Sequence, residues 1–212
     1  MWLTLRVTRG LDGRDDKLLQ WISDSGLACL IAVAEALAEA TRDIPIVMTV
    51  MIDPIEIGIS TSMSRPSRNV TGFTSSSPTL AAKRLELLHE LLPDLRKVAA
   101  FGSPTGSVFA IYDQHLKSAA DRFGISIFNI PVNAETELAS AFERVDREQV
   151  QAVLVEVNPS SVRLSVHIID QCLVRDLPSV HPWAFTVQAG ALMSYGPPTV
   201  ENVAGAARYV DR

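Results

Sequence analysis

The chain has 212 residues, of which 47% are hydrophobic and 20% charged, a composition typical of a globular protein rather than a disordered one. Its 19 Lys and Arg against 24 Asp and Glu give a formal net charge of -5. This negative charge and the lack of a basic stripe in the sequence exclude a nucleic-acid-binding surface, because phosphate binding needs clustered basic residues. The longest apolar stretches are far shorter than the roughly 20 residues of a membrane-spanning helix, so we expect no transmembrane segment.

The N-terminal part of the chain has a mixed pattern. Residues 3–7 alternate as a strand would, and residues 28–42 carry apolar positions on a helical period. Residues 1–16 lack the positive start and apolar core of a secretory signal. We therefore expect no export signal in the chain as written.

The next segment predicts a strand, a polar loop and a second strand. The apolar run 44–52 ends at Asp53 and Pro54, where Asp53 suits the N-cap of a short helix. Residues 70–74 then predict a short strand. Residues 75–78, with the sequence SSSP, are the clearest linker in the chain, and we expect the first crossing between two lobes there.

From residue 79 onward, helices and strands alternate with little ambiguity. The predicted helices are 79–92, 107–123, 135–148 and 162–175, and the predicted strands are 97–101, 125–130, 152–157 and 179–181. Strands separated by single helices imply right-handed parallel crossovers, which predicts a complete α/β lobe. A short helix at 183–189, a strand at 192–195 and a helix from 199 are expected to follow.

No catalytic or metal-binding motif is present. The glycine-bounded segment 102–106 lacks the lysine of a phosphate-binding loop and is interpreted as an ordinary turn. Cys29 and Cys172 lie far apart without the spacing of a metal site, and we interpret both as buried small hydrophobes. We expect no metal and no cofactor.

The histidines and one glutamate need separate interpretation. His89, His115 and His167 fall within predicted helices and are interpreted as partly exposed surface residues, whereas His181 ends a strand and could face a cleft. Glu156 lies inside an apolar run, either on an edge strand or as a buried charge that needs a partner. We favour the edge strand.

An ordered set of short motifs resembles one protein family. The motifs are IPIV at 44–47, DP at 53–54, RP at 65–66, NVTGF at 69–73, KRLELL at 83–88 and GALMSYGP at 190–197. Together they are similar to the ABC transporter substrate-binding proteins whose characterised members bind aromatic amino acids. The resemblance covers residues 44–212 well and residues 3–43 poorly.

This resemblance implies an α/β protein of two doubly wound parallel-sheet lobes, like the periplasmic binding proteins, with the first lobe incomplete. The first lobe is expected to comprise residues 1–77 and 190–212, including the strand at 192–195, and the second lobe residues 78–189. Family members begin earlier and continue further, so the chain is interpreted as truncated at both ends.

The resemblance also implies a small-molecule ligand, possibly an amino acid, in a cleft between the lobes. Such a ligand needs a partner for its ammonium, donors for its carboxylate and apolar walls. The candidate ligand-binding residues, all in strand-end loops or returning segments, are Asp53, Thr71, Ser103, Asn158, Ser194 and Tyr195. Asp53 is expected to pair with the ammonium. Leu30, Ile31 and Ala32 stand where the family has a Gly-Thr-Pro-like turn, which predicts weak carboxylate binding.

The function implied is the substrate-binding component of an ABC transporter, not an enzyme, with an ABC permease as partner. Two alternatives remain: a truncated, non-functional family fragment, or an enzyme on a doubly wound fold, which a cluster of perturbed groups around Asp53, Glu156 and His181 would favour. The family works in the periplasm or elsewhere outside the cytoplasmic membrane. Without a signal, the chain as written would stay in the cytoplasm.

Overall fold

The structure is a computed structural model that describes residues 41–44, 46–48, 54–55, 58–65, 69–74, 78–102, 107–197 and 202. The chain divides into two units, one formed by residues 1–76 with 198–212 and the other by residues 77–197. Predictions for the strand at 3–7, the helices at 28–42 and from 199, and for Cys29, Leu30, Ile31, Ala32, Asp53 and Ser103 lie outside or almost wholly outside the described residues.

In the first unit, two short parallel strands are described. β1 (Ile46–Met48) and β2 (Val70–Gly72) lie within the predicted strands and pair with Val47 opposite Thr71. The side chain of Asn69 donates to the Ile44 carbonyl at 2.6 Å, which fixes the start of this pair. Gly72 has a φ of 138° and no room for a Cβ against the Met48 carbonyl, so the sequence needs glycine there.

The second unit is built on a five-stranded parallel sheet with the order β4-β3-β5-β6-β7. Its strands are β3 (Lys97–Gly102), β4 (Ser126–Pro131), β5 (Ala152–Val155), β6 (Ser179–His181) and β7 (Met193–Ser194). The chain moves outward from β3 to β4, then returns to β5 on the other side of β3. This reversal makes the boundary between β3 and β5 a topological switch point.

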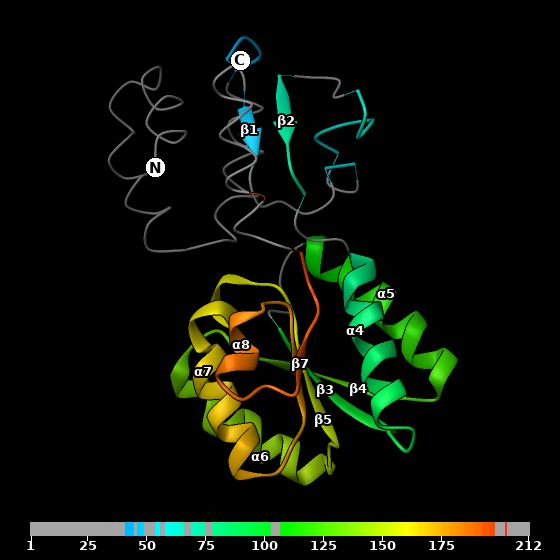
Figure 1. Ribbon diagram of the computed structural model, residues 1–212, viewed down its shortest axis with the longest axis vertical. Coiled ribbons are helices and arrows are strands. Elements are labelled where there is room, and N and C mark those ends of the chain that lie inside the picture. The colour runs from blue at the N-terminus through cyan, green and yellow to red at the C-terminus, as the bar shows by residue number, and fades with distance from the viewer. Residues whose placement is uncertain are drawn as a thin grey trace. The chain divides into compact units, whose positions relative to one another are not determined.

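Helices cover both faces of this sheet (Figure 1). They are α4 (Pro78–Leu91), α5 (Ser107–Phe123), α6 (Leu138–Glu148), which follows a 3-10 turn at Glu135–Glu137, α7 (Pro159–Val174) and the short α8 (Phe185–Gln188). These bounds agree with the predicted helices to within a few residues. The predicted α/β class with parallel sheets is confirmed.

One strand assignment was wrong. The strand predicted at 192–195 was expected to belong to the first lobe, but β7 pairs with β6 in the sheet of the second unit, with His181 opposite Ser194. The Tyr195 amide also donates to the His181 carbonyl at 2.9 Å. The segment that ends β7 therefore contributes to the carboxyl edge of this sheet.

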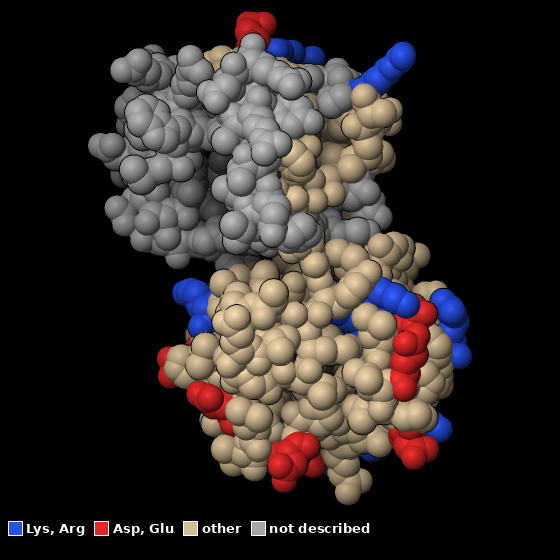
Figure 2. Space-filling model, viewed as in Figure 1, with Lys and Arg blue, Asp and Glu red and all other residues tan. Residues whose placement is uncertain are grey.

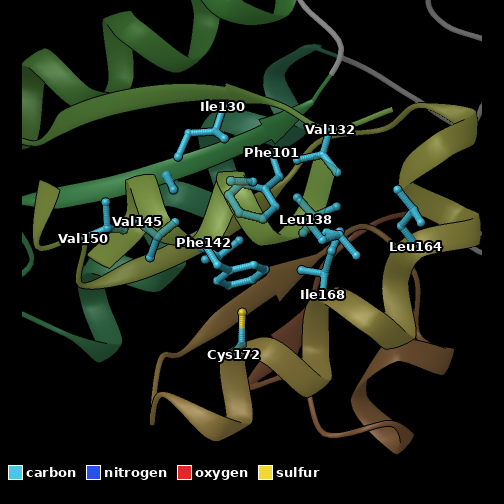
Figure 3. Close-up of a cluster of buried hydrophobic side chains, with 14 residues drawn as sticks. Phe101, Ile130, Val132, Leu138, Phe142, Val145, Val150, Leu164, Ile168 and Cys172 are labelled. Atoms are coloured by element: carbon cyan, nitrogen blue, oxygen red, sulfur yellow. The ribbon is translucent and has the colours of Figure 1, made fainter. Parts of the chain in front are cut away.

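Two apolar clusters hold the second unit together, one on each face of the sheet. Along β3, Val98 and Ala100 point to the cluster under α4 and α5, while Ala99 and Phe101 point to the cluster under α6 and α7. Figure 3 shows this second cluster, in which the Phe101 and Phe142 rings meet edge to face at 5.2 Å. Alternate side chains of one strand thus pack into the two clusters, as a sheet covered on both faces requires.

The same cluster contains Cys172, which is 2% exposed and packs with Ile168 of α7 against the sheet (Figure 3). The prediction that this cysteine is a buried small hydrophobe is confirmed. Burial raises the pKa of its thiol to about 12, so the group stays protonated at neutral pH.

Charged side chains on the face of the second unit in Figure 2 are scattered, with acidic and basic groups interspersed. In the part of the chain that the structure describes, no helix is both long and apolar enough to cross a membrane.

The packing of α4 provides a matched test of the core. Leu88 is fully buried under α4, whereas Leu91, in the last turn of the same helix, is 57% exposed. We expect Leu88→Ala to lower the free energy of unfolding by about 2 to 5 kcal/mol, because it leaves a cavity. Leu91→Ala should cost less than about 1 kcal/mol. Urea unfolding of both variants checks this, and equal losses would contradict the layer assignment.

Candidate functional site

The carboxyl edge of the five-stranded sheet gathers buried polar groups at its switch point. Ligands of open α/β folds bind beside the strands where the chain direction reverses, here β3 and β5. Gly102 ends β3 and Glu156 follows β5, while the neighbouring β6 ends on His181. Arg84 of α4 joins them from the helical layer. The edge cluster thus consists of Arg84, Glu156 and His181.

Two hydrogen bonds hold the backbone of Glu156 in place. Its amide donates to the Phe101 carbonyl at 2.9 Å, and its own carbonyl accepts from the Ser161 hydroxyl at 2.7 Å. Its carboxyl group lies over Gly102, where a Cβ would overlap Oε2. The absence of a side chain at Gly102 therefore makes the room that this carboxyl group occupies.

The expectation that Glu156 lies on an edge strand was wrong. β5 runs between β3 and β6, and Glu156 is only 5% exposed. Burial raises the pKa of this carboxyl group to about 7, although the nearby Arg84 opposes the shift and Asp113 adds to it. The alternative interpretation, a buried charge that needs a partner, is the correct one.

Arg84 is the largest fully buried polar side chain of the described residues. Its Nη1 donates to the Tyr195 carbonyl at 3.0 Å, whereas Nε and Nη2 have no hydrogen-bond partner. Burial lowers the pKa of the guanidinium to about 10, against the attraction of Tyr112 and Glu156. Arg84 is therefore a cation at neutral pH that is removed from water and incompletely hydrogen-bonded.

His181 completes the edge cluster as a neutral group. Its ring is fully buried, with Nε2 3.2 Å from the Ser179 hydroxyl and Nδ1 without a partner. Burial, and secondarily the Arg84 charge, lowers the pKa of this imidazole to about 4. The ring is then uncharged at pH 7 and can donate or accept one hydrogen bond at Nδ1.

Three residues predicted to bind ligand border the edge cluster. Asn158 is the N-cap of α7: its side chain accepts from the Ser161 amide at 2.7 Å, and its buried Nδ2 has no partner. Ser194 pairs with His181 in the sheet register. Tyr195 takes part through its backbone amide and carbonyl, while its side chain is 39% exposed.

The other predicted site residues lie in the first unit or outside the described residues, so they stay predictions. Thr71 lies in β2 of the first unit, half-buried and opposite Val47. Asp53 and Ser103 fall outside the described residues.

The sequence contained a signal for Arg84, which was not predicted as a site residue. Arg84 lies three residues after Ala81 and four before Leu88, which puts a charge on the apolar stripe of its helix. Glu156 interrupts an apolar strand in the same way. Ionisable residues at positions that must be buried point to a functional cluster, and reading the two positions together would have located it.

The structure gives no indication of a metal centre: among the described residues, no three His, Cys, Asp or Glu side chains converge as ligands would. The edge cluster combines a cation, one titratable carboxyl group and one neutral imidazole. Such a set suits hydrogen bonding to a small polar ligand better than coordination of a metal ion.

The pKa of Glu156 predicts a pH-dependent stability. Because the folded-state pKa is raised from 4.5 to about 7, ionisation destabilises the fold above pH 7, and this cost disappears as the pH falls toward 4.5. His181 acts oppositely and destabilises the fold below its unfolded pKa. Glu156→Gln removes only the first effect. The free energy of unfolding of this variant, relative to that of the wild type, should therefore be about 2 kcal/mol higher at pH 8 than at pH 5.

Urea unfolding of the wild type and the variant at both pH values measures this difference. Glu143→Gln on exposed α6 surface serves as the control and should show no such gain. A difference between wild type and Glu156→Gln that stays constant with pH would contradict the buried ionisation.

Comparison with known proteins places the chain among transport proteins. Residues 25–212 match the family described as ABC transporter substrate binding protein. A tyrosine-binding protein of Clostridioides difficile (strain R20291) is 42% identical over 65 residues, which span 31% of this chain and 18% of that protein.

Solved structures share the fold. A domain from Streptococcus pneumoniae in complex with L-Trp has a TM-score of 0.69 at 24% identity, covering 84% of this chain and 61% of that one. A conserved domain protein from Vibrio cholerae gives a TM-score of 0.71 at 24% identity, covering 84% of this chain and 59% of that one. The chain thus spans about three-fifths of the solved proteins it resembles. With the family match over residues 25–212, this shows that the chain belongs to the ABC transporter substrate-binding protein family.

Proposed function

We propose that the protein binds an amino acid, and in particular an aromatic one, as the substrate-binding component of an ABC transporter. The edge cluster is the observation that carries this proposal. Arg84, Glu156 and His181 are buried at a switch point with polar atoms that nothing in the described structure satisfies. Buried polar atoms without partners are rare in native proteins unless a ligand or an ordered water completes them.

The relatives support the chemical class of ligand. The protein that is 42% identical over 65 residues is named for tyrosine binding, and one solved neighbour holds L-Trp. An amino acid carries both charges, and the edge cluster offers a cation and a titratable carboxyl group within one another's field. Electrostatic complementarity of this kind gives specificity for a zwitterion over a neutral sugar.

The remaining predicted residues are proposed contributors to the same function. Asn158, Ser194 and Tyr195 border the edge cluster, while Asp53, Thr71 and Ser103 stay predictions from the sequence, as does the placement of the ligand between the lobes. By family, the protein works outside the cytoplasmic membrane and delivers its ligand to an ABC permease. Loading and release by hinge motion are how such proteins work.

An enzyme remains the second candidate, because one observation favours it. A carboxyl group with a pKa of about 7 is suited to act as a general base at neutral pH. His181, however, has a pKa of about 4 and cannot serve as the acid there. Incubation of the protein with L-tryptophan followed by mass spectrometry separates the two: a binding protein returns the amino acid unchanged, whereas an enzyme converts it.

The proposed function predicts selective stabilisation by amino acids. L-Tryptophan, L-tyrosine or L-phenylalanine at about 100 times its dissociation constant should raise the free energy of unfolding by about 2.7 kcal/mol, because only the folded state binds it. Thermal unfolding with and without each compound, supported by isothermal titration calorimetry, measures this. D-Glucose at the same concentration is the control. Equal shifts with glucose, or none with any amino acid, would refute the proposal.

A further inference from the structure

The two unsatisfied nitrogen atoms of Arg84 lie on one edge of its guanidinium group. Nε and Nη2 together form the side-on edge, from which two N–H bonds project in parallel, and neither has a partner. The opposite nitrogen, Nη1, is already engaged by the Tyr195 carbonyl at 3.0 Å. The orientation of the group is thus fixed by α4 on one side and by the end of β7 on the other.

A parallel pair of N–H donors is the geometry that a carboxylate fills with two hydrogen bonds. Arg forms such two-point contacts because its planar fork matches the spacing of the two oxygens. No side chain of the described residues provides this contact. The electrostatic attraction on the guanidinium comes from Tyr112 and then from Glu156, whose Oε1 is itself without a partner. Leaving a buried cation half satisfied is costly, so an external carboxylate would have a strong advantage there.

The unpartnered Glu156 oxygen restricts which carboxylates fit. Oε1 can accept a hydrogen bond but, when ionised, repels a second negative charge in a site from which water is removed. A ligand that brings its own ammonium group next to its carboxylate carries a partner of the right charge for each of the two residues. An α-amino acid is the smallest common ligand with that arrangement.

We propose that Arg84 binds the carboxylate of an α-amino acid through Nε and Nη2, and that Glu156 accepts a hydrogen bond from the ligand's ammonium group. This assignment rests on the proposed amino-acid-binding function and names the residues that would select the ligand's charged end. Because Arg84 has no exposed surface, the ligand enters only when the site opens.

The ligand itself can be varied without changing the protein. Isothermal titration calorimetry on the whole 212-residue chain compares L-tryptophan with tryptamine, which lacks the carboxylate, and with indole-3-propionate, which lacks the ammonium. We expect tryptamine to bind at least about 100-fold more weakly than L-tryptophan, because the fork of Arg84 stays empty. Indole-3-propionate should also lose affinity, by about 10-fold, because Glu156 then faces the anion without a counter-charge.

A variant tests the same contact from the protein side. Arg84→Lys keeps the charge but removes the fork, and should weaken L-tryptophan about 10- to 100-fold while leaving tryptamine unchanged. Arg163→Lys is the matched control, because Arg163 is an exposed arginine whose one hydrogen bond among the described residues goes to the Asn133 carbonyl, at 3.2 Å. That variant should bind both compounds as the wild type does.

The outcomes separate this proposal from the function on which it rests. If the wild type binds L-tryptophan but tryptamine binds equally well, or Arg84→Lys retains the preference, Arg84 does not hold the carboxylate and only the present proposal falls. If the wild type binds no amino acid, the proposed function fails and this assignment fails with it. Should Arg84→Lys not fold, the comparison of the three compounds on the wild type decides alone.

Discussion

The second unit must accommodate a cation, the guanidinium group of Arg84, that has no access to water. Arg84 is fully buried, and its single hydrogen bond within the described structure goes to the Tyr195 carbonyl. Burial of a charge is tolerated only where fixed dipoles and opposite charges surround it. The neighbouring groups follow from this: Glu156 supplies negative charge, His181 stays neutral, and the end of β7 supplies a carbonyl oxygen.

The strand order explains why these groups meet. Arg84, Glu156, His181 and Tyr195 are far apart in the sequence, but a parallel sheet brings the ends of β5, β6 and β7 to one edge. The two apolar clusters then fix the helices on either face, so that α4 carries Arg84 to this edge. A rigid scaffold with incompletely satisfied polar groups at one edge is what a binding site built on such a sheet requires.

Hydrophobic periodicity predicted most of the second unit. Helix α5 and strand β6 match the predicted bounds, because long amphipathic helices and short buried strands leave clear patterns. The partner of β7 was not predictable in this way. Its two residues, Met193 and Ser194, carry no pattern that identifies a neighbour, and the family resemblance pointed to the wrong lobe.

The site was only partly predictable for a similar reason. Asn, Ser and Tyr in strand-end loops were predicted from their position alone, and Asn158 has the ordinary role of such a residue, because it caps α7. Arg84 was missed because a charge on a helix is normally interpreted as part of its solvated face. Only the burial of that face by β6 and α5 makes the charge unusual, and burial is a property of the tertiary fold.

The close approach of Glu156 to Gly102 restricts how this protein can evolve. Any residue other than glycine at position 102 would displace the carboxyl group, and a smaller residue at position 156 would remove the need for glycine. Each position therefore determines which substitutions the other tolerates. Among relatives that keep this strand end, the two positions should vary together, and a lineage that lost the carboxyl group would be free to acquire a side chain at the end of β3.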